Sequence, residues 1–553
     1  MRSRTLVLGV DGATFDVIDP LVRAGRMPAL TRLMGDGVRA RLRSTCPPVS
    51  APAWVTFLTG KHPGKHGVFN FQNLDARRYS GFSETLVNSS YFRGGTLLDH
   101  LGETGERRVL SYRIPMTFPP WDIPNAVVVA GPPLPDRRRA YARPAATEAE
   151  IGPVSTLSND EVAAAKRARD VAVIEACNRF ELDLLERVTA RYLADGTDLV
   201  IGFTGIVDSL HHFFWGFHDP ASPVHEPGAP EALRTVITRA YEEIDRTIGR
   251  IVARCDGDTA VIVLSDHGGG PAPHRQLNLN AFLRERGLLA AAAGKAELAT
   301  RVRRLVDGAR PLLPGRAWMK RHLPERVQQG LRGLRNATGA IAWERTRAYA
   351  IPIYYPITGV WVNLAGRQAK GTVAAGAEYE RLRDDLVAAL ADLADPASGT
   401  PLVRGVWRRE EVYSGPHTED APDLVVETAP GYHGGFETDR VVSEVPRATL
   451  ASVSGSHVPE GIFVAAGGPF RRGVALDPPS LADVLPTVLH LLGVPLPDDL
   501  DGRVVTEALE PEFVAANPVR VAPRQGGAAG RVSLSSDDEG EMRKFLQGLG
   551  YVE

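Results

Sequence analysis

Six aspartate and histidine residues stand at positions where they could bind metal ions. Asp208 and His212 are four residues apart, so on a helix both side chains would lie on one face and could bind the same ion. The others adjoin apolar runs: Asp11, the pair Asp266-His267, and His457. Carboxylate and imidazole ligands together suit Zn²⁺ well, although Mn²⁺ or iron also binds them. We therefore predict two divalent-cation sites, with about three protein ligands each.

Ser50 is the predicted nucleophile. Two metal ions about 4 Å apart can activate both the attacking and the leaving oxygen of a phosphate ester, and a serine hydroxyl needs such activation. Ser50 precedes Ala51-Pro52-Ala53, where proline favours the first turn of a helix, whose N–H groups attract phosphate. An ordinary helix cap is the structural alternative. The rival hydroxyl groups are those of Ser44, Thr45 and Thr56.

Strand and helix patterns alternate along the chain, which predicts an α/β fold with a parallel sheet. Three predicted strands end close to acidic residues, namely Asp11, Asp208 and Asp266. Because open α/β sheets bind ligands beyond the carboxyl ends of their strands, these three ends indicate one shared site. The predicted strands are 6–10, 126–130, 199–203, 260–264 and 462–465, and the predicted helices are 16–35, 51–59, 160–195, 229–253, 376–393 and 480–492.

The composition argues against several classes of function. With 64 lysines and arginines against 66 acidic residues, the net charge of -2 gives no general attraction to nucleic acid or anionic lipid. Cys46, Cys177 and Cys255 form no CxxC motif and are odd in number, which argues against a disulfide framework. The first apolar run is too short for a secretory signal, and the chain has no run of about 20 apolar residues. We expect a cytoplasmic protein without membrane insertion.

Three parts are predicted along the chain. A catalytic domain covers 1–285 and 346–510, and a basic helical insertion at 286–345 interrupts it. Within the insertion, residues 295–335 hold eleven lysines and arginines against three acidic residues, which suits either a cap over the site or a solvated face. Trp318 is the only aromatic residue of that stretch, so a groove for single-stranded nucleic acid is not expected. Residues 511–553 are predicted to be a linker and a C-terminal helical tail.

The order of the motifs resembles that of the alkaline phosphatase superfamily. They are Val10-Asp11-Gly12, Ser50 to Gly60, Asp208-x3-His212, Ser265-Asp266-His267-Gly268 and Gly455-x-His457. The pattern is similar to the type I phosphodiesterase and nucleotide pyrophosphatase branch, and within it to bacterial predicted phosphohydrolases or phosphomutases. Ser480 to Gly493 and Asp501-Gly502 extend the resemblance to about residue 505. It implies a three-layer αβα sandwich around a mostly parallel central sheet, with a helical insertion.

Carried over to this chain, the resemblance implies two zinc sites and a phosphoserine intermediate. Asp208, His212 and His457 would hold one ion, and Asp11, Asp266, His267 and the oxygen of Ser50 would hold the other. The nucleophile of this superfamily lies nine residues before a Thr-Gly pair, here Thr59-Gly60, which favours Ser50. The implied activity is hydrolysis of a small phosphodiester or phosphomonoester, with nucleotides among the candidate substrates.

Two positions depart from related families. Sulfatases carry an arginine where this chain has Trp54, and two consecutive acidic residues where Asp11 is followed by Gly12. Nucleotide pyrophosphatases carry a phosphate-binding asparagine where this chain has Ala53, so phosphate needs other donors. The candidates are the Ser50 N–H, Lys61, His274 and Arg275. A sulfatase, a phosphomutase and a non-catalytic binding protein on this fold stay as alternatives.

Overall fold

The computed structural model describes residues 4–105, 107–135, 140–292, 341–524, 530–549 and 551, which form two compact units. Unit 1 consists of residues 1–73, 84–271 and 453–553, and unit 2 of residues 74–83 and 272–452. The predicted catalytic domain includes segments of both units, and most of the predicted insertion at 286–345 lies outside the described residues. The predicted domain division therefore stays a prediction. Among the described helices, none is long and apolar enough to cross a membrane.

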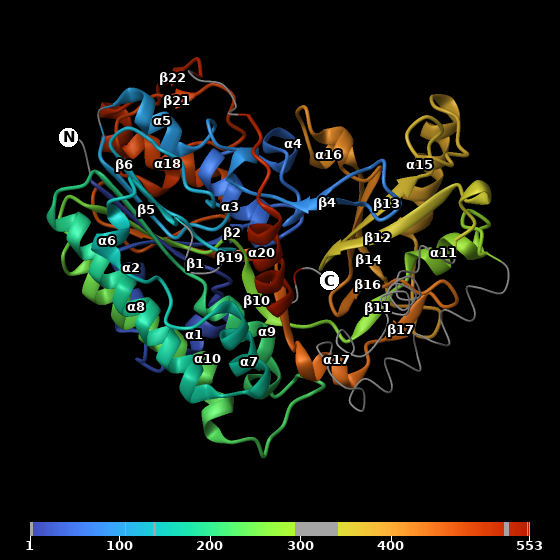
Figure 1. The fold of residues 1–553 in the computed structure, drawn as a ribbon, viewed down its shortest axis with the longest axis horizontal. Helices are drawn as coiled ribbons and strands as arrows, with labels where there is room; N and C mark the ends of the chain where they lie inside the picture. The colour runs from blue at the N-terminus through green and yellow to red at the C-terminus, as the bar shows by residue number, and fades with distance from the viewer. Residues whose placement is uncertain are drawn as a thin grey trace. The chain divides into compact units, whose positions relative to one another are not determined.

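A nine-stranded sheet forms the centre of unit 1, in the order β20-β2-β19-β9-β1-β8-β5-β6-β7 (Figure 1). Strand β1 (Thr5–Val10) is parallel to β8 (Leu199–Thr204) and β9 (Ala260–Leu264). The parallel part continues through β5 (Val109–Tyr112) and β6 (Ala126–Val129). The antiparallel exceptions are β19 (Glu460–Ala466), which lies between β9 and β2 (Gly37–Arg43), and β7 (Ala142–Arg143) beside β6. The short β20 (Val474–Ala475) is parallel to β2. The predicted α/β fold with a mostly parallel central sheet is confirmed.

Helices cover both faces of this sheet because consecutive side chains of a strand point to opposite faces. Leu6 and Leu8 of β1 belong to a core shared with helices α1 (Phe15–Arg23), α2 (Pro28–Gly35), α8 (Val171–Ala194) and α10 (Glu231–Val252). On the other face, α3 (Ser50–Thr59) places Trp54 against Gly9, where an added Cβ would lie 2.5 Å from the indole ring. Helices α5 (Leu97–Thr104) and α18 (Val484–Leu491) pack against α3.

Two of the predicted helices are each two helices in the structure. The prediction for 16–35 divides into α1 and α2 at Gly25, whose φ of 71° ends the first helix. The prediction for 160–195 divides at Arg169, which has a φ of 57°, into α7 (Asn159–Ala168) and α8. Asp170 then caps α8 by accepting the backbone N–H of Val173 at 3.2 Å. Periodicity misses such breaks because a helix can end at a single left-handed residue and the next helix can begin at once.

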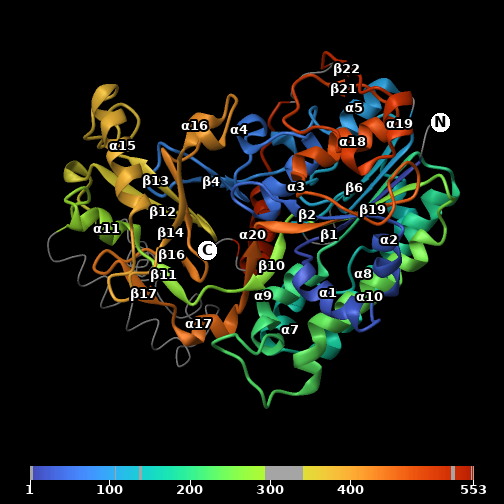
Figure 2. The same cartoon turned by 180° about the vertical axis from the view of Figure 1, so that it is seen from behind.

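Unit 2 is built on a four-stranded antiparallel sheet in the order β12-β13-β15-β14 (Figure 2). Its strands are β12 (Ala348–Tyr354), β13 (Ile357–Val362), β15 (Leu424–Thr428) and β14 (Val403–Arg408). Helix α15 (Ala377–Ala391) packs on β13 and β14. A second, three-stranded sheet contains β16 (Tyr432–Gly434), β11 (Arg275–Leu277) and β17 (Val442–Glu444).

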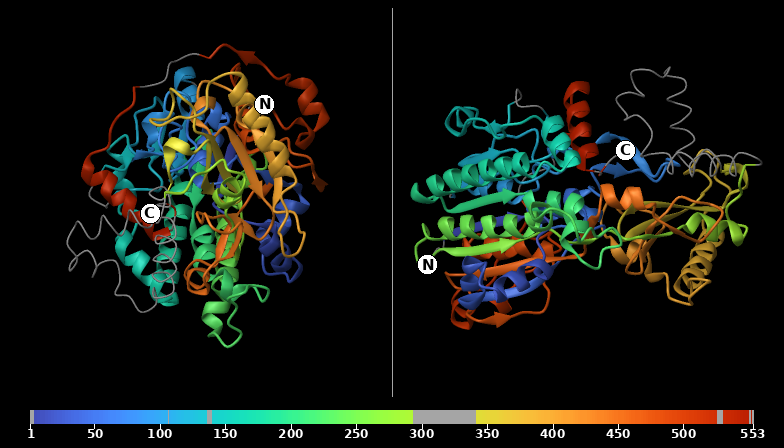
Figure 3. Two further views of the ribbon diagram at one scale, coloured as in Figure 1. Left: turned by 90° about the vertical axis from the view of Figure 1, so that its right-hand side faces the viewer. Right: turned by 90° about the horizontal axis from the view of Figure 1, so that it is seen from below.

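The C-terminal segment returns to unit 1. Helix α20 (Ser536–Leu549) packs against α7, and Figure 3 shows it in red beside the turquoise helices of that unit. Met542 and Leu546 of α20 are each about 1 % exposed, so one side of the helix is fully buried. The segment is therefore an integral part of unit 1.

Candidate metal centre

Asp11 lies directly after the central strand β1, where its backbone N–H donates to the carbonyl oxygen of Thr204 at 3.0 Å. The next residue, Gly12, has a φ of 70°. A Cβ at Gly12 would lie 3.0 Å from both the Cα and the Cβ of Asp208. Glycine at position 12 therefore allows the turn after β1 to approach α9 (Ile206–His218) closely enough to bring the two carboxylates into one site.

Helix α9 and the end of β9 supply the next four predicted ligands. Asp208 and His212 lie one turn apart on α9, and Asp208 Oδ1 is 3.5 Å from His212 Nε2, as their spacing predicts. Ser265 follows β9 and precedes Asp266 and His267. Its hydroxyl donates to the carbonyl of Ala13 at 2.9 Å, which ties this loop to the turn that follows β1.

His457 lies on β18 (Gly455–Val458), which pairs antiparallel with β10 (Gly268–Pro271). His457 Nδ1 donates to the carbonyl of Pro48 at 2.9 Å, and His267 Nδ1 donates to the carbonyl of Gly268 at 3.1 Å. The two rings stack with their centroids 3.5 Å apart. Because each Nδ1 donates a hydrogen bond to a carbonyl, the Nε2 of each ring is the atom that can bind a cation.

The predicted ligands form two adjoining buried groups. The first contains Asp11, Asp266 and His267, and the second contains Asp208, His267 and His457; in each group the ligand atoms lie within 4.8 Å of one another. His212 adds to the second group, since its Nε2 lies 3.1 Å from His457 Nε2. The structure thus brings together all six residues that the sequence analysis predicted as Asp and His ligands.

Ser50 begins α3 beside the first group. Its Oγ lies 3.1 Å from His267 Nε2 and 3.4 Å from Asp11 Oδ1. Two of the three rival hydroxyl groups have other partners: that of Thr45 donates to the carbonyl of Pro47 at 2.8 Å, and that of Thr56 lies 3.0 Å from His66 Nε2 inside the helix. The buried Ser44 Oγ has no hydrogen-bond partner among the described residues. Of the four candidate nucleophiles, Ser50 is thus the one with hydrogen-bond contacts to the predicted ligands Asp11 and His267.

The charges of these groups fit divalent cations. Burial, together with the nearby Asp266 and Asp208, raises the pKa of Asp11 well above its usual value, and burial raises that of Asp266 to about 8. Burial lowers the pKa of His267 and of His457, which favours the neutral imidazole that binds metals. Among the described residues, no lysine or arginine forms an ion pair with the three carboxylates, and the buried Asp266 Oδ2 has no hydrogen-bond partner. Two bound cations would compensate this charge.

Trp54 has a role that the sequence analysis did not predict. Its indole Nε1 donates to Asp11 Oδ2 at 2.9 Å, and its ring contacts Phe57 and Phe203 edge to face. Trp54 is fully buried, so the hydrogen bond is shielded from water. The contact holds the carboxylate of Asp11 in one orientation.

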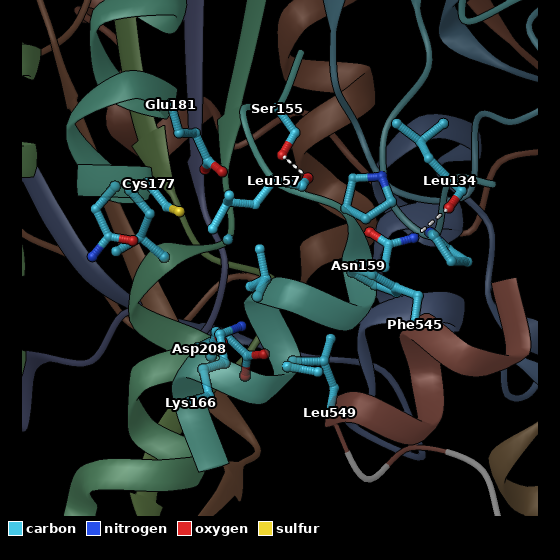
Figure 4. A pocket seen from close by; sticks show the side chains of 18 of the residues that line it. Leu134, Ser155, Leu157, Asn159, Lys166, Cys177, Glu181, Asp208, Phe545 and Leu549 are labelled. Carbon is cyan, nitrogen blue, oxygen red and sulfur yellow. Dashed lines mark hydrogen bonds between the residues drawn. The ribbon is translucent and has the colours of Figure 1, made fainter. Parts of the chain in front are cut away.

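A cavity of about 230 Å³ lies beside Asp11, Ser50 and Asp208 (Figure 4). Most of its lining is apolar and comes from residues 132–135, from α7 and α8, and from α20. Lys166 of α7 lines it too, near Asp208, and makes no ion pair among the described residues. Burial lowers the pKa of Lys166 to about 8, although the charge of Asp208 opposes that shift.

Of the side chains predicted to donate hydrogen bonds to phosphate, Lys61 and Arg275 have other partners. Lys61 is buried, forms an ion pair with Asp499, and is not among the residues that line the cavity. His274 and Arg275 belong to unit 2. There the His274 carbonyl accepts the N–H of Val445, and the Arg275 guanidinium bonds Asp395 and Tyr432. Their role in substrate binding stays a prediction.

Sequence and structure comparisons relate the chain to known proteins. Residues 5–439 match the model of the type I phosphodiesterase / nucleotide pyrophosphatase family, a family of phosphoric ester hydrolases. No curated protein matches the chain significantly in sequence. The phosphonoacetate hydrolase from Sinorhizobium meliloti 1021, solved in complex with phosphonoacetate, is similar in fold, with 15% identity and a TM-score of 0.51 over 89% of this chain and 96% of that one.

Two mammalian structures match with lower scores. The murine ectonucleotide pyrophosphatase / phosphodiesterase 5, as an inactive variant in complex with AMP, has a TM-score of 0.47 at 14% identity over 92% of this chain and 100% of that one. The human protein of that name has a TM-score of 0.46 at 14% identity, with the same coverage. The family model covers most of the chain, and the predicted family is confirmed. The chain belongs to the type I phosphodiesterase / nucleotide pyrophosphatase family.

Proposed function

We propose that this enzyme hydrolyses phosphate esters of small molecules with Ser50 as the nucleophile and two divalent cations, Zn²⁺ first and Mn²⁺ as the alternative. The observation that supports it most directly is the position of Ser50 Oγ, 3.1 Å from His267 Nε2 and 3.4 Å from Asp11 Oδ1, at the start of a buried helix. A helix N-terminus adds N–H groups that favour the phosphate oxygens.

Two sets of residues would hold the cations. Asp11, Asp266 and His267 would hold the ion beside Ser50, and Asp208, His212 and His457 would hold the second. When bound, the cations supply charge for the phosphate oxygens and lower the pKa of an adjacent hydroxyl. The mixed carboxylate and imidazole ligand set favours Zn²⁺ over the oxygen-rich ligation of Ca²⁺.

The reaction itself takes place at Ser50 in two steps. Its oxygen loses a proton and bonds to phosphorus while the bond to the alcohol oxygen breaks, and the alcohol leaves with a proton. Water then attacks the phosphoserine, which releases inorganic phosphate, or a phosphate monoester when the substrate is a diester, and restores the hydroxyl of Ser50. The buried site excludes other water molecules and strengthens each electrostatic contact.

A sulfatase is the second candidate function, because the hydrolysis of sulfate esters and of phosphate esters both acts on a tetrahedral anionic group. The contact between Trp54 and Asp11 supports the phosphatase proposal, since an indole at the position of the sulfatase arginine gives sulfate no positive charge. A phosphomutase would use the same phosphoserine but return the phosphoryl group to a second hydroxyl.

The test is an assay of metal-stripped protein with added Zn²⁺ or Mn²⁺. Its substrates are p-nitrophenyl phosphate, bis-p-nitrophenyl phosphate and p-nitrophenyl sulfate. We expect metal-dependent release from a phosphate substrate, and a loss of at least about a thousandfold in kcat for Ser50→Ala. Ser44→Ala is the matched control, because the buried Ser44 Oγ has no hydrogen-bond partner among the described residues. Equal activity of Ser50→Ala and Ser44→Ala would remove Ser50 from the mechanism, and release from the sulfate alone would favour the sulfatase.

A further inference from the structure

Tyr551, near the C-terminal end of the chain, reaches the second group of predicted ligands. Its hydroxyl oxygen lies 2.9 Å from Asp208 Oδ2, 3.1 Å from His457 Nε2 and 3.4 Å from His212 Nε2. Its ring contacts Phe71, which also lines the cavity, with the centroids 4.8 Å apart. The hydroxyl of Tyr551, which belongs to the predicted C-terminal tail, thus lies within hydrogen-bond distance of three predicted metal ligands.

Specific contacts fix the C-terminal segment, residues 530–549 and 551, on the surface of unit 1. The carbonyl of Val532 accepts a hydrogen bond from the side-chain amide of Asn88 at 3.1 Å, and the N–H of Val532 donates to Ser90 Oγ at 2.9 Å. Glu539 accepts the backbone N–H of Leu86 at 3.2 Å, and Arg543 bonds the carbonyl of Glu84. Each of these bonds involves a main-chain group, either of Val532 or of Glu84 and Leu86, so together they set the register of the segment along the surface.

The segment also forms one wall of the cavity. Met542 and Leu546 face the interior, whereas Phe545 and Leu549 line the cavity opposite Lys166 and Asp208 (Figure 4). Tyr551 follows at the end of this wall that adjoins the ligands. An apolar cavity of about 150 Å³ can hold benzene, so a space of about 230 Å³ suits an organic group of roughly one ring.

The hydroxyl of Tyr551 adds a hydrogen-bond donor directly beside the predicted ligands Asp208, His212 and His457. Ionised carboxylates only accept hydrogen bonds, and an imidazole that holds a cation through Nε2 cannot donate from it. A phenol hydroxyl can donate one hydrogen bond. Ala53, in the first turns of α3, has no side-chain donor to offer phosphate.

We propose that Tyr551 is a substrate-binding residue. Its hydroxyl would donate its hydrogen to a phosphate oxygen in place of Asp208 Oδ2, the present acceptor, while Phe545 and Leu549 contact the organic group of the ester. The proposal rests on the proposed function, because the phosphate would lie between Ser50 and Asp208. It assigns the substrate class as phosphate esters of small, largely apolar alcohols. It also makes the C-terminal segment a part of the active site.

The test measures binding without turnover. Isothermal titration calorimetry of inorganic phosphate and of phenylphosphonate would be carried out on zinc-loaded wild-type protein, Tyr551→Phe and Tyr192→Phe. We expect Tyr551→Phe to bind both ligands about 10- to 100-fold more weakly, as for the loss of a hydrogen bond to a charged group. Its zinc content should equal that of the wild type. Tyr192 is a half-buried tyrosine of the same unit that does not line the cavity, so its variant should bind like the wild type.

A further variant, Leu549→Ala, separates the wall from the hydroxyl. It should weaken the binding of phenylphosphonate and leave that of inorganic phosphate unchanged, because phosphate has no organic group. A gain of phosphate affinity in Tyr551→Phe would mean that the hydroxyl obstructs the site, and a loss of zinc would mean that it is a metal ligand; either result overturns the proposal, as does unchanged binding. Wild-type protein that binds neither ligand and hydrolyses no phosphate ester would instead contradict the proposed function.

Discussion

Replacing Trp54 by phenylalanine tests whether the indole orients Asp11 for metal binding. The substitution keeps an aromatic ring between Phe57 and Phe203 but removes the Nε1–H that donates to Asp11 Oδ2 at 2.9 Å. Both residues are buried, so water does not replace the lost donor. We expect weaker metal binding and a lower free energy of unfolding.

The size of the effect depends on the ionisation of Asp11. In metal-free protein the raised pKa of Asp11 favours its protonated form, and the bond is then worth about 0.5–1.5 kcal/mol. With a cation bound, the carboxylate is ionised, and the bond is worth about 1.5–3 kcal/mol. The difference between these two hydrogen-bond free energies should appear as a loss of metal affinity of about tenfold or more. This lies within the range observed when the hydrogen-bond partner of a metal ligand is removed by mutation. Thermal unfolding should therefore show a larger destabilisation of the metal-loaded protein than of the metal-free protein.

The assay is a titration of Zn²⁺ into metal-stripped protein against a chromophoric chelator. Trp361→Phe is the matched control, because Trp361 is also fully buried and its Nε1 has no hydrogen-bond partner among the described residues. Trp361→Phe should leave the zinc affinity unchanged. If Trp54→Phe destabilised both states equally and bound Zn²⁺ as tightly as the wild type, Trp54 would be a packing residue and the argument would be wrong.

Two further predictions concern the turn at Gly12 and the cavity lysine. Gly12→Ala should lower zinc affinity and cost about 1–3 kcal/mol of stability, because it adds strain at positive φ and a Cβ 3.0 Å from Asp208. Gly25→Ala has a similar φ of 71° and open space around its Cβ, so it should cost stability without changing zinc affinity. Lys166 has its pKa lowered to about 8, so its acetylation rate, followed by mass spectrometry against pH, should have its midpoint near 8. A midpoint near 10.4, the value for a free lysine, would contradict the burial of its amino group.

Local sequence patterns determined the fold class and the candidate metal ligands of this protein. Apolar runs that end at Asp11 and Asp266 mark parallel strands, and their carboxyl ends meet at one edge of a sheet. The spacing of Asp208 and His212 places both on one face of α9 because a helix repeats every 3.6 residues. These inferences need only neighbouring residues or the general geometry of α/β sheets. The same patterns did not show the breaks near Gly25 and Arg169, where a left-handed backbone conformation ends a helix without changing the apolar period.

Tertiary structure alone decided which distant side chains contact the site. Trp54 donates a hydrogen bond to Asp11 because α3 packs on the face of β1 opposite α1. Lys61 forms an ion pair with Asp499 and does not line the cavity beside Ser50. Tyr551 lies 343 residues from Asp208 along the chain, yet its hydroxyl is 2.9 Å away. Periodicity and spacing describe residues within one element, whereas such contacts depend on the order of the strands and on where the C-terminal segment packs. That packing is set by the sum of many weak contacts over unit 1, and no single motif of the sequence encodes it.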